Sequence, residues 1–511
     1  MAAAPSIAPS PMTAEQQYLD LFAAQRSVID AKGAPVLNAR RDAAAATLRR
    51  LGLGKRAKDF TPTDPAQLLA ADYALNLERF EVPTSPADLF TCGIPDLSTR
   101  LYYLINEQYV RSRTPQAEDC LDAPEPYYAG SLRQFALTHP DLAEQYYDRL
   151  AAQDHTAPTH GRGRRESTCS PGESALNTMF CQDGFVLYVP AGTVLERPFQ
   201  LISLMRSMDD FMACQRLLII IGEGARASLL VCDHASELAD TALLSLQVTE
   251  VFVGRGATFD FYALEEHHSR VRRLSQVYVH QDEGSNTSVG QFALTAGITR
   301  NRVHIDLAGQ HAETHLFGMV IADGTQQVDN LTFIDHRHPH GTSHELFKYV
   351  LDDEARGGFV GRILVRDGAV KTDAHQTDRN LCLSPRARML ARPELEIYAD
   401  DVKCSHGATV GQLDPQALFY MRTRGISESE ARMLLMFAFM GDVIEQIRIA
   451  PLRDRLRHLV EKRFRGELTA AGCKGCKGAV PRPAAPDAPD APAAPASPDA
   501  SATPDASAPH T

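Results

Sequence analysis

For more than 200 residues, from about 175 to 400, the chain is a succession of short apolar segments separated by turns that contain glycine. Clear examples rich in Val, Ile, Leu and Phe lie at residues 185–189, 217–221, 246–253 and 318–322. Segments of this length and composition are typical of β-strands. No helix-length segment interrupts them, which argues against alternating strands and helices. The sequence therefore predicts that this region is all β.

The turns between these strands recur at similar intervals. The glycine turns at residues 222–225 and 254–257 are 32 residues apart, and those at 282–285 and 308–310 follow after about 28 and about 25 more. Approximate repetition at this spacing predicts a β-solenoid in which each coil supplies two or three strands. A double-sheet jelly roll contains similar strands and is the alternative.

Helical signals flank the β region. Thr13 with Gln16 forms a capping pattern at the start of an amphipathic segment, and Ser427 with Glu430 forms another near the C-terminus. The two ends are rich in Ala and Pro, a composition that does not bury enough apolar surface to fold. The expected organisation is a disordered N-terminus at 1–12, a helical region at 13–160, a β core at 175–412, a helical region at 413–470 and a disordered tail at 477–511.

Charge and composition exclude several classes of function. The 52 Lys and Arg residues against 64 Asp and Glu give a net charge of −12, which argues against nucleic-acid binding. The longest apolar run, residues 433–440, is far shorter than the roughly 20 residues of a membrane-spanning helix. The N-terminus does not resemble a secretory signal, so we expect a cytoplasmic protein whose ten scattered cysteines are thiols. No phosphate-binding loop is present, so we expect no ATP site on this chain.

A histidine-rich segment is the first candidate site. His336, His338, His340 and His344 fall within nine residues, and imidazole is a common metal ligand. In an extended segment, the side chains of 336, 338 and 340 would share one face. Pro339 interrupts regular extension, and a polar turn whose imidazoles bind backbone groups explains the segment equally simply.

The second candidate is the pair Cys404 and His406. Two residues apart on a strand, their side chains would point the same way, and Glu394 and Glu396 would share that face if the strand extended back to them. A thiolate, an imidazole and a carboxylate together would suit iron or zinc. Lys403 or a protonated His406 would lower the pKa of the Cys404 thiol. A buried structural cysteine beside a hydrogen-bonded histidine is the simpler alternative.

A third motif, Cys473 with Cys476, is a lone CxxC at the edge of the expected tail. It has no second CxxC and no βαβ context, so its spacing alone specifies neither a zinc site nor a redox pair. We assign it no role.

A series of segments in the same order resembles the SufB/SufD family of iron–sulfur cluster assembly proteins, and the SufD branch in particular. The resemblance covers residues 175–445 well and the N-terminal region loosely. The matching segments are ALNT at 175–178, HPH at 338–340, SHELFKY at 343–349, GGFVG at 357–361, KTDAHQ at 371–376, Asn380 with LSP at 383–385, PELEI at 393–397, VKCSHGAT at 402–409 and RGIS at 424–427.

The resemblance implies a right-handed parallel β-helix with helical regions at both ends. It also implies a non-catalytic scaffold subunit of a SufBC2D-type complex, in which SufD pairs with SufB through the β-helix ends. Each of these two subunits binds a copy of the ATPase SufC through its C-terminal helices. The complex builds nascent iron–sulfur clusters from sulfur delivered by a cysteine desulfurase system. A homodimer is a further expectation for the chain alone, and no sequence feature indicates a flavin.

Residue by residue, the resemblance makes His406 the expected ligand of iron or of the nascent cluster at the SufB interface, with Cys404 as the secondary candidate. Cys382 replaces the family's usual aliphatic residue, and we expect it to be a small buried apolar side chain. A histidine ligand would suit a labile cluster, because stable clusters are normally held by thiolates.

The C-terminal helix is the expected SufC-docking element. Its Met433, Met436, Phe437 and Met440 are adaptable apolar groups, although the same stripe would also serve as a helix core. The alternative function from a different class is a β-solenoid or jelly-roll metalloenzyme that uses the cluster from His336 to His344.

Overall fold

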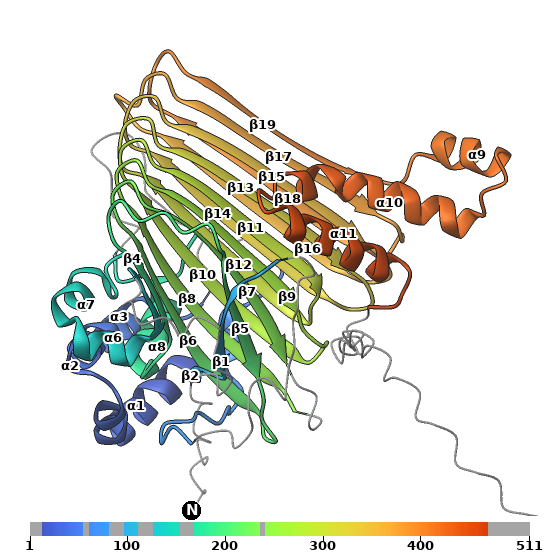
Figure 1. Ribbon diagram of the computed structural model, residues 1–511. Helices are drawn as coiled ribbons and strands as arrows, with labels where there is room; N and C mark the ends of the chain where they lie inside the picture. Colours follow the sequence, from blue (N-terminus) through green and yellow to red (C-terminus); the bar gives the residue numbers. More distant parts are fainter. Residues whose placement is uncertain are drawn as a thin grey trace, which may run out of the picture.

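The computed structural model describes residues 13–54, 61–80, 97–110, 126–153, 168–235 and 241–468. The expected disordered ends and Cys473 with Cys476 therefore lie outside the described residues. The centre of the molecule is a long β-helix built from two sheets that face each other (Figure 1). From β4 onward, odd-numbered strands form one sheet and even-numbered strands form the other, and we call these the odd-numbered and the even-numbered sheet; β1 and β2 belong to the first and β3 to the second.

The two sheets alternate along the chain. The ten-stranded sheet contains β1 (Arg100–Ile105), β2 (Gln108–Val110), β5 (Phe199–Met205), β7 (Arg226–Ala235), β9 (Thr258–Glu266), β11 (Asn286–Thr295), β13 (Glu313–Ala322), β15 (Thr342–Leu351), β17 (Asp373–Cys382) and β19 (Lys403–Gly411). The nine-stranded sheet contains β3 (Tyr128–Ser131), β4 (Phe185–Val189), β6 (Phe211–Ile221), β8 (Leu243–Val253), β10 (Val271–Gln281), β12 (Ile298–Leu307), β14 (Gln327–His336), β16 (Arg356–Val365) and β18 (Arg388–Ile397).

Each coil lies directly on the one before it. From β4 to β19 the neighbouring strands are parallel and in register, and partners are about 26 to 32 residues apart, as in Phe211 with Leu243. This is the predicted solenoid, and the parallel pairing excludes the jelly-roll alternative. The predicted glycine turns join the two sheets. Gly224, Gly256 and Gly284 all have a φ of +64°, a backbone conformation that favours glycine.

The space between the sheets is the main apolar core. Alternate residues of each strand point inward, so that Val277, Val303 and Ile334 from successive coils pack in one continuous cluster. Aromatic rings fill the N-terminal end of this space: Tyr102 lies 5.4 Å from Phe185, and Tyr127 lies 5.0 Å from Phe199, between ring centroids. The N-terminal end of the β-helix is therefore plugged by aromatic side chains.

The N-terminal region covers the first coils and the outer face of the even-numbered sheet. Helix α8 packs against β6 and β8, while the short strands β1 and β3 extend the two sheets. The helical region predicted at 13–160 therefore also contains short strands, which the prediction did not include. The helices of this region are α1 (Ala14–Lys32), α2 (Pro35–Asn38), α3 (Arg41–Leu51), α4 (Pro65–Leu69), α6 (Leu132–Thr138), α7 (Pro140–Tyr146) and α8 (Pro171–Phe180).

A buried ion-pair network holds this region on the sheet. The Arg216 guanidinium on β6 lies 2.6 Å from Glu250 and 2.9 Å from Asp148, and the exposed fraction of its side chain is 0%. Glu250 also accepts hydrogen bonds from the backbone N–H groups of Asp148, Leu150 and Ala151. The carboxylate thus fixes the segment after α7 to β8.

The C-terminal helices are α9 (Pro415–Thr423), α10 (Glu428–Glu445) and α11 (Ala450–Phe464). Both α10 and α11 pack on the outer face of the odd-numbered sheet, whereas α9 projects away from the body (Figure 1). The buried Lys348 ammonium on β15 anchors α10 by donating to the Phe439 carbonyl and the Asp442 carboxylate, both at 2.6 Å. The predicted caps are confirmed, since Thr13 and Ser427 accept from the backbone N–H groups of Gln16 and Glu430.

Among the described residues, no helix is both long and apolar enough to cross a membrane.

The Arg216 network predicts a large loss of stability when its cation is removed. Arg216→Leu leaves two buried carboxylates without a counter-charge, so we expect the free energy of unfolding to fall by about 3–5 kcal/mol. The measurement is urea unfolding followed by circular dichroism. Arg255→Leu is the matched control, because the Arg255–Glu223 pair is exposed and contributes less than about 1 kcal/mol. Equal losses in the two variants would contradict this account.

Candidate functional site at the open end of the β-helix

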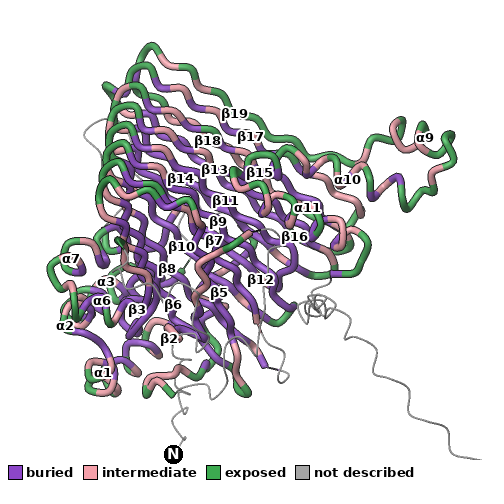
Figure 2. The backbone as a smooth tube through the Cα atoms, viewed as in Figure 1, coloured by how far each residue is buried: buried purple, intermediate pink, exposed green. Residues whose placement is uncertain are grey.

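The C-terminal end of the β-helix is open. Strand β19 pairs only with β17, and β18 pairs only with β16, so within the described part of the chain both have one free edge. Eight of the nine residues of β19 are exposed, whereas only one of the ten residues of β17 beneath it is exposed and most of β15 is buried (Figure 2). Strands with unpaired N–H and C=O groups are templates for pairing with another chain. This end is therefore the part of the β-helix suited to contact a partner.

Cys404 and His406 both lie on β19. Their register partners on β17 are Ala374 and Gln376, which face the interior, so both side chains start from the inner face of the last coil. The two side chains share a face, as their spacing predicted. Cys404 is half-buried against the apolar core, and His406 is exposed at the rim.

The Cys404 thiol does not have the lowered pKa that the sequence suggested. Burial raises the pKa of Cys404, and the nearby Asp373 carboxylate raises it further, while a backbone hydrogen bond at Ala374 opposes them. Lys403 is the adjacent residue on the strand and projects from the opposite face, so it does not stabilise a thiolate. Burial likewise raises the pKa of Cys382, which is half-buried against the core rather than fully enclosed.

The carboxylates expected beside this pair lie elsewhere. Glu394 and Glu396 belong to β18, because the chain turns between Ile397 and Lys403 and crosses to the other sheet. Both occupy outward positions of β18, where Glu394 pairs with Arg392 at 2.6 Å and Glu396 pairs with Arg362. The predicted convergence of thiolate, imidazole and carboxylate is therefore wrong, since it assumed one continuous strand.

The four histidines of the sequence cluster do not converge. His336 points into the core and forms a hydrogen bond with the Ser343 hydroxyl. His340 lies in the following turn, and its ring is 4.7 Å from that of His311. His344 points outward from β15. His338 lies in the same turn as His340. Across the described ranges, no group of three or more His, Cys, Asp or Glu residues is arranged to hold a metal ion. The metalloenzyme alternative thus has no geometric support.

A histidine ladder lies on the outer face of the odd-numbered sheet. His315, His344 and His375 are register partners on β13, β15 and β17, and their rings stack at 5.4 and 5.5 Å. The sequence contained the signal for this ladder, because the three residues recur at the coil spacing. His315 and His375 already bind the Glu313 and Asp373 carboxylates, at 2.7 and 2.8 Å.

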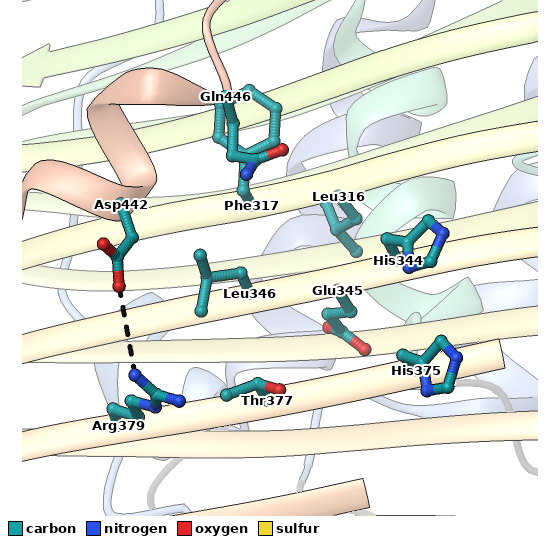
Figure 3. Close-up of a pocket in the computed structure, with 10 residues that line it drawn as sticks. All are labelled: Leu316, Phe317, His344, Glu345, Leu346, His375, Thr377, Arg379, Asp442 and Gln446. Carbon is teal, nitrogen blue, oxygen red and sulfur yellow. Dashed lines mark ion pairs between the residues drawn. The ribbon is translucent and has the colours of Figure 1, made fainter. Parts of the chain in front are cut away.

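A small cavity of about 250 Å³ adjoins the ladder (Figure 3). His344, His375 and Thr377 line its sheet side, and the other side is formed by Asp442 of α10 and Gln446, the residue that follows the helix. The Arg379 guanidinium lies 3.9 Å from the Asp442 carboxylate across this cavity. The cavity is thus a gap of mixed polarity between the sheet and the helix packed on it, because Leu316, Phe317 and Leu346 also line it.

Sequence reasoning missed the polar side chains inside the last coils. Gln376, Asp378 and Asn380 alternate along β17 and are buried, with Glu345 beside Gln376 on β15. They occupy inward positions that are apolar in most earlier coils. Their alternation along the strand is visible in the sequence, but polar residues at alternate positions of a strand are normally expected to face solvent.

Three of the four side chains predicted to face an ATPase are buried within the chain itself. Met433, Met436 and Met440 belong to the cluster that seats α10 and α11 on the sheet, and Phe437 is half-buried against it. These methionines therefore form the core between the helices and the sheet, which was the alternative interpretation of this apolar stripe. The exposed apolar side chains of this region are Phe419 (70% exposed), Tyr420 (59%) and Leu434 (38%).

Comparison with known proteins places this architecture in a family. The model of the SufBD core domain of the SUF system for FeS cluster assembly matches residues 204–439, and the model of the SufBD N-terminal region matches residues 12–201. The chain belongs to the SufBD family of iron–sulfur cluster assembly proteins. In this SufBD-family chain, the two models together cover the N-terminal region, the β-helix, α9 and the first two thirds of α10.

Curated relatives agree with this assignment. The chain is 32% identical over 297 residues to a SufBD-family protein of Synechocystis, an alignment that covers 57% of this chain and 66% of the relative. It is 32% identical over 197 residues to the iron–sulfur cluster assembly protein SufD of Escherichia coli, covering 38% of this chain and 47% of the relative. It is also 26% identical over 337 residues to SufD of Bacillus subtilis, covering 64% and 72%. The chain thus spans less than two thirds of the length of the first two relatives.

The interior position of His336 predicts a specific pH dependence of stability. Burial lowers the pKa of His336 from 6.5 to about 3, so below pH 6.5 the unfolded chain takes up a proton that the folded chain does not. The contribution of neutral His336 to the free energy of unfolding is fully present above pH 6.5 and decreases as the pH falls toward 3. Between pH 6.5 and 4.5 the loss amounts to about 2–3 kcal/mol.

His336→Gln keeps a partner for Ser343 but does not titrate. We expect its free energy of unfolding to fall less than that of wild type over the same pH interval, by about 2–3 kcal/mol. Urea unfolding at several pH values measures the difference. Parallel curves for the two proteins would show that His336 is not a buried neutral side chain. His340→Gln, at an exposed turn position, is the control and should follow wild type.

Proposed function

We propose that this chain is a SufD-like scaffold subunit of a SufBC2D-type complex that assembles iron–sulfur clusters. The observation that carries the proposal is the open C-terminal end of the β-helix, where two free strand edges flank His406 in a family that assembles clusters. The scaffold itself is non-catalytic, and the nascent cluster is its cargo. ATP hydrolysis belongs to the partner ATPase.

The open end has the properties of a surface for a SufB-like subunit. The edges of β18 and β19 offer backbone groups for strand pairing. Apolar side chains remain uncovered beside them, with Val410 53% exposed and both Ile397 and Tyr398 41% exposed. Such a patch next to free edges favours a protein partner over solvent. A partner that pairs with these edges would continue the β-helix and enclose the rim that carries His406.

At this rim, the exposed His406 imidazole would bind iron or the nascent cluster at the junction of the two subunits. Cys404 lies on the same face but deeper, and its thiol has a raised pKa, so it supplies a thiolate only when a metal displaces its proton. An imidazole ligand makes the bound cluster labile, which suits transfer to other proteins.

His406→Ala tests the role of this residue. In a strain that depends on this chain for cluster assembly, we expect at least a tenfold drop in cluster formation while the complex with the SufB-like subunit still forms. Complementation and co-purification measure the two properties. Thr409→Ala is the matched control, because Thr409 is an exposed residue on the outward face of the same strand. Full activity of His406→Ala would refute the assignment.

The C-terminal helices supply the proposed dock for a SufC-like ATPase. Helix α9 has no buried residues and extends away from the body, so its Phe419 and Tyr420 are uncovered for a partner. We therefore assign the dock to Phe419 and Tyr420 and not to the methionines of α10, because those methionines pack on the sheet. Two large exposed aromatic side chains at a helical projection are typical binding anchors.

Removing these aromatic side chains should weaken the ATPase contact. We expect the double variant Phe419→Ala, Tyr420→Ala to bind the SufC-like ATPase at least tenfold more weakly, with unchanged thermal stability because neither side chain is buried. Co-purification and titration measure the affinity. Met436→Leu preserves the buried volume of α10 and should bind like wild type. If the double variant binds normally, the projecting helix is not the dock.

A further inference from the structure

The polar side chains in the lumen below the rim make an unusual set. Gln376, Asp378 and Asn380 occupy successive inward positions of β17, and none is more than 2% exposed. They lie one coil beneath His406, which is the register partner of Gln376. Because aromatic rings plug the N-terminal end of the lumen, the open end is the nearer route from solvent to these groups.

Hydrogen bonds occupy the amide donors of this set but not all of its oxygens. Gln376 Nε2 donates to Glu345 Oε2 at 2.6 Å, and Asn380 Nδ2 donates to Asp378 Oδ2 at 2.8 Å and to the Thr409 carbonyl at 3.0 Å. One oxygen of each β17 side chain has no hydrogen-bond partner: Gln376 Oε1, Asp378 Oδ1 and Asn380 Oδ1. Buried acceptors without a donor are costly and are rare in native proteins.

The carboxyl groups of this set also have no cationic neighbour in the lumen. The inward positions of β14 to β19 contain no Lys or Arg, so nothing there balances Glu345 and Asp378. Lys348, Arg362 and Arg379 occupy outward positions. Burial raises the pKa of both carboxyl groups to about 7. Buried carboxylates are normally paired with a cation or bound to a metal.

The opposite sheet leaves room for these side chains. A Cβ atom on Gly361 of β16 would lie 2.3 Å from Gln376 Nε2 and 2.6 Å from the Phe359 ring. The Gln376 carboxamide therefore reaches across the lumen to a position that only glycine leaves free. Phe359 and Ile363 line the same side, so the unpartnered oxygens lie in an environment of low polarity.

We propose that the lumen of the last coils binds one hard divalent cation through the free oxygens of Gln376 and Asp378 and the Glu345 carboxylate, with Asn380 holding the second oxygen of Asp378. Carboxylate and carbonyl oxygens are the ligands that such cations prefer. The Asp378 and Glu345 carboxylates together balance a charge of +2. Iron(II) held here would lie one coil below His406, as a reserve for cluster assembly, and this use of the site rests on the proposed function.

Manganese(II) alone is the probe, because its electron paramagnetic resonance signal reports binding directly. The full chain is first stripped of metal with a chelator and then titrated at pH 8, where both carboxyl groups are ionised. We expect one tight site per chain, weakened at least tenfold by Asp378→Asn and by Glu345→Gln. Asp373→Asn is the matched control, because Asp373 occupies an outward position on the same strand and should not affect binding.

Each variant removes a buried negative charge, and circular dichroism establishes that it is folded before the titration. Binding no tighter than that of exposed carboxylates, or equal binding by wild type, Asp378→Asn and Glu345→Gln, overturns the proposal. His406→Ala separates the two hypotheses, since it should keep the manganese site. If His406→Ala loses cluster assembly but keeps the manganese site, both the cation site and the proposed function are supported. If His406→Ala assembles clusters normally and keeps the manganese site, only the proposed function is refuted.

Discussion

The in-register stacking of parallel strands is the constraint on which the rest of this structure depends. Because side chains alternate along a strand and each coil lies directly on the last, an inward residue in one coil places its partner inward in the next. A single register thus decides which residues form the core, which form ladders on the outer faces and which meet at the rim. The apolar column through Val277 and Val303 on the inner face of the even-numbered sheet follows from this rule, and so does the histidine ladder on the outer face of the odd-numbered sheet.

The two ends of the β-helix differ: the N-terminal end is filled by side chains and the C-terminal end is open. Tyrosine and phenylalanine rings fill the N-terminal end, where short antiparallel strands finish both sheets. At the C-terminal end, β18 and β19 keep free edges, and α10 with α11 packs on a sheet face without covering them. An exposed strand edge tends to pair with other chains, so its retention beside His406 fits a subunit that functions in a complex.

The candidate site shows where sequence reasoning reaches its limit. The spacing of Cys404 and His406 correctly placed both on one face, because alternation is local. The expected contribution of Glu394 and Glu396 failed because the chain turns after Ile397 and places them on the other sheet. The lowered pKa expected for Cys404 was wrong because burial and the Asp373 carboxylate raise it. The methionines of α10 were ambiguous in sequence, since an apolar stripe fits both a core and a dock, and only the packing against β13 and β15 resolved them.

The sequence by itself determined the all-β centre, its coil spacing, the glycine turns and the helix caps, because each depends on contacts between residues close in the chain. It also carried the resemblance that the family models bear out. Only the tertiary structure decided that Glu345, Gln376, Asp378 and Asn380 are enclosed, that the four clustered histidines diverge and that α9 stands free. These outcomes depend on how residues about 30 positions apart in the chain pair in stacked coils and on which elements cover each sheet face. No local sequence pattern encodes either of these.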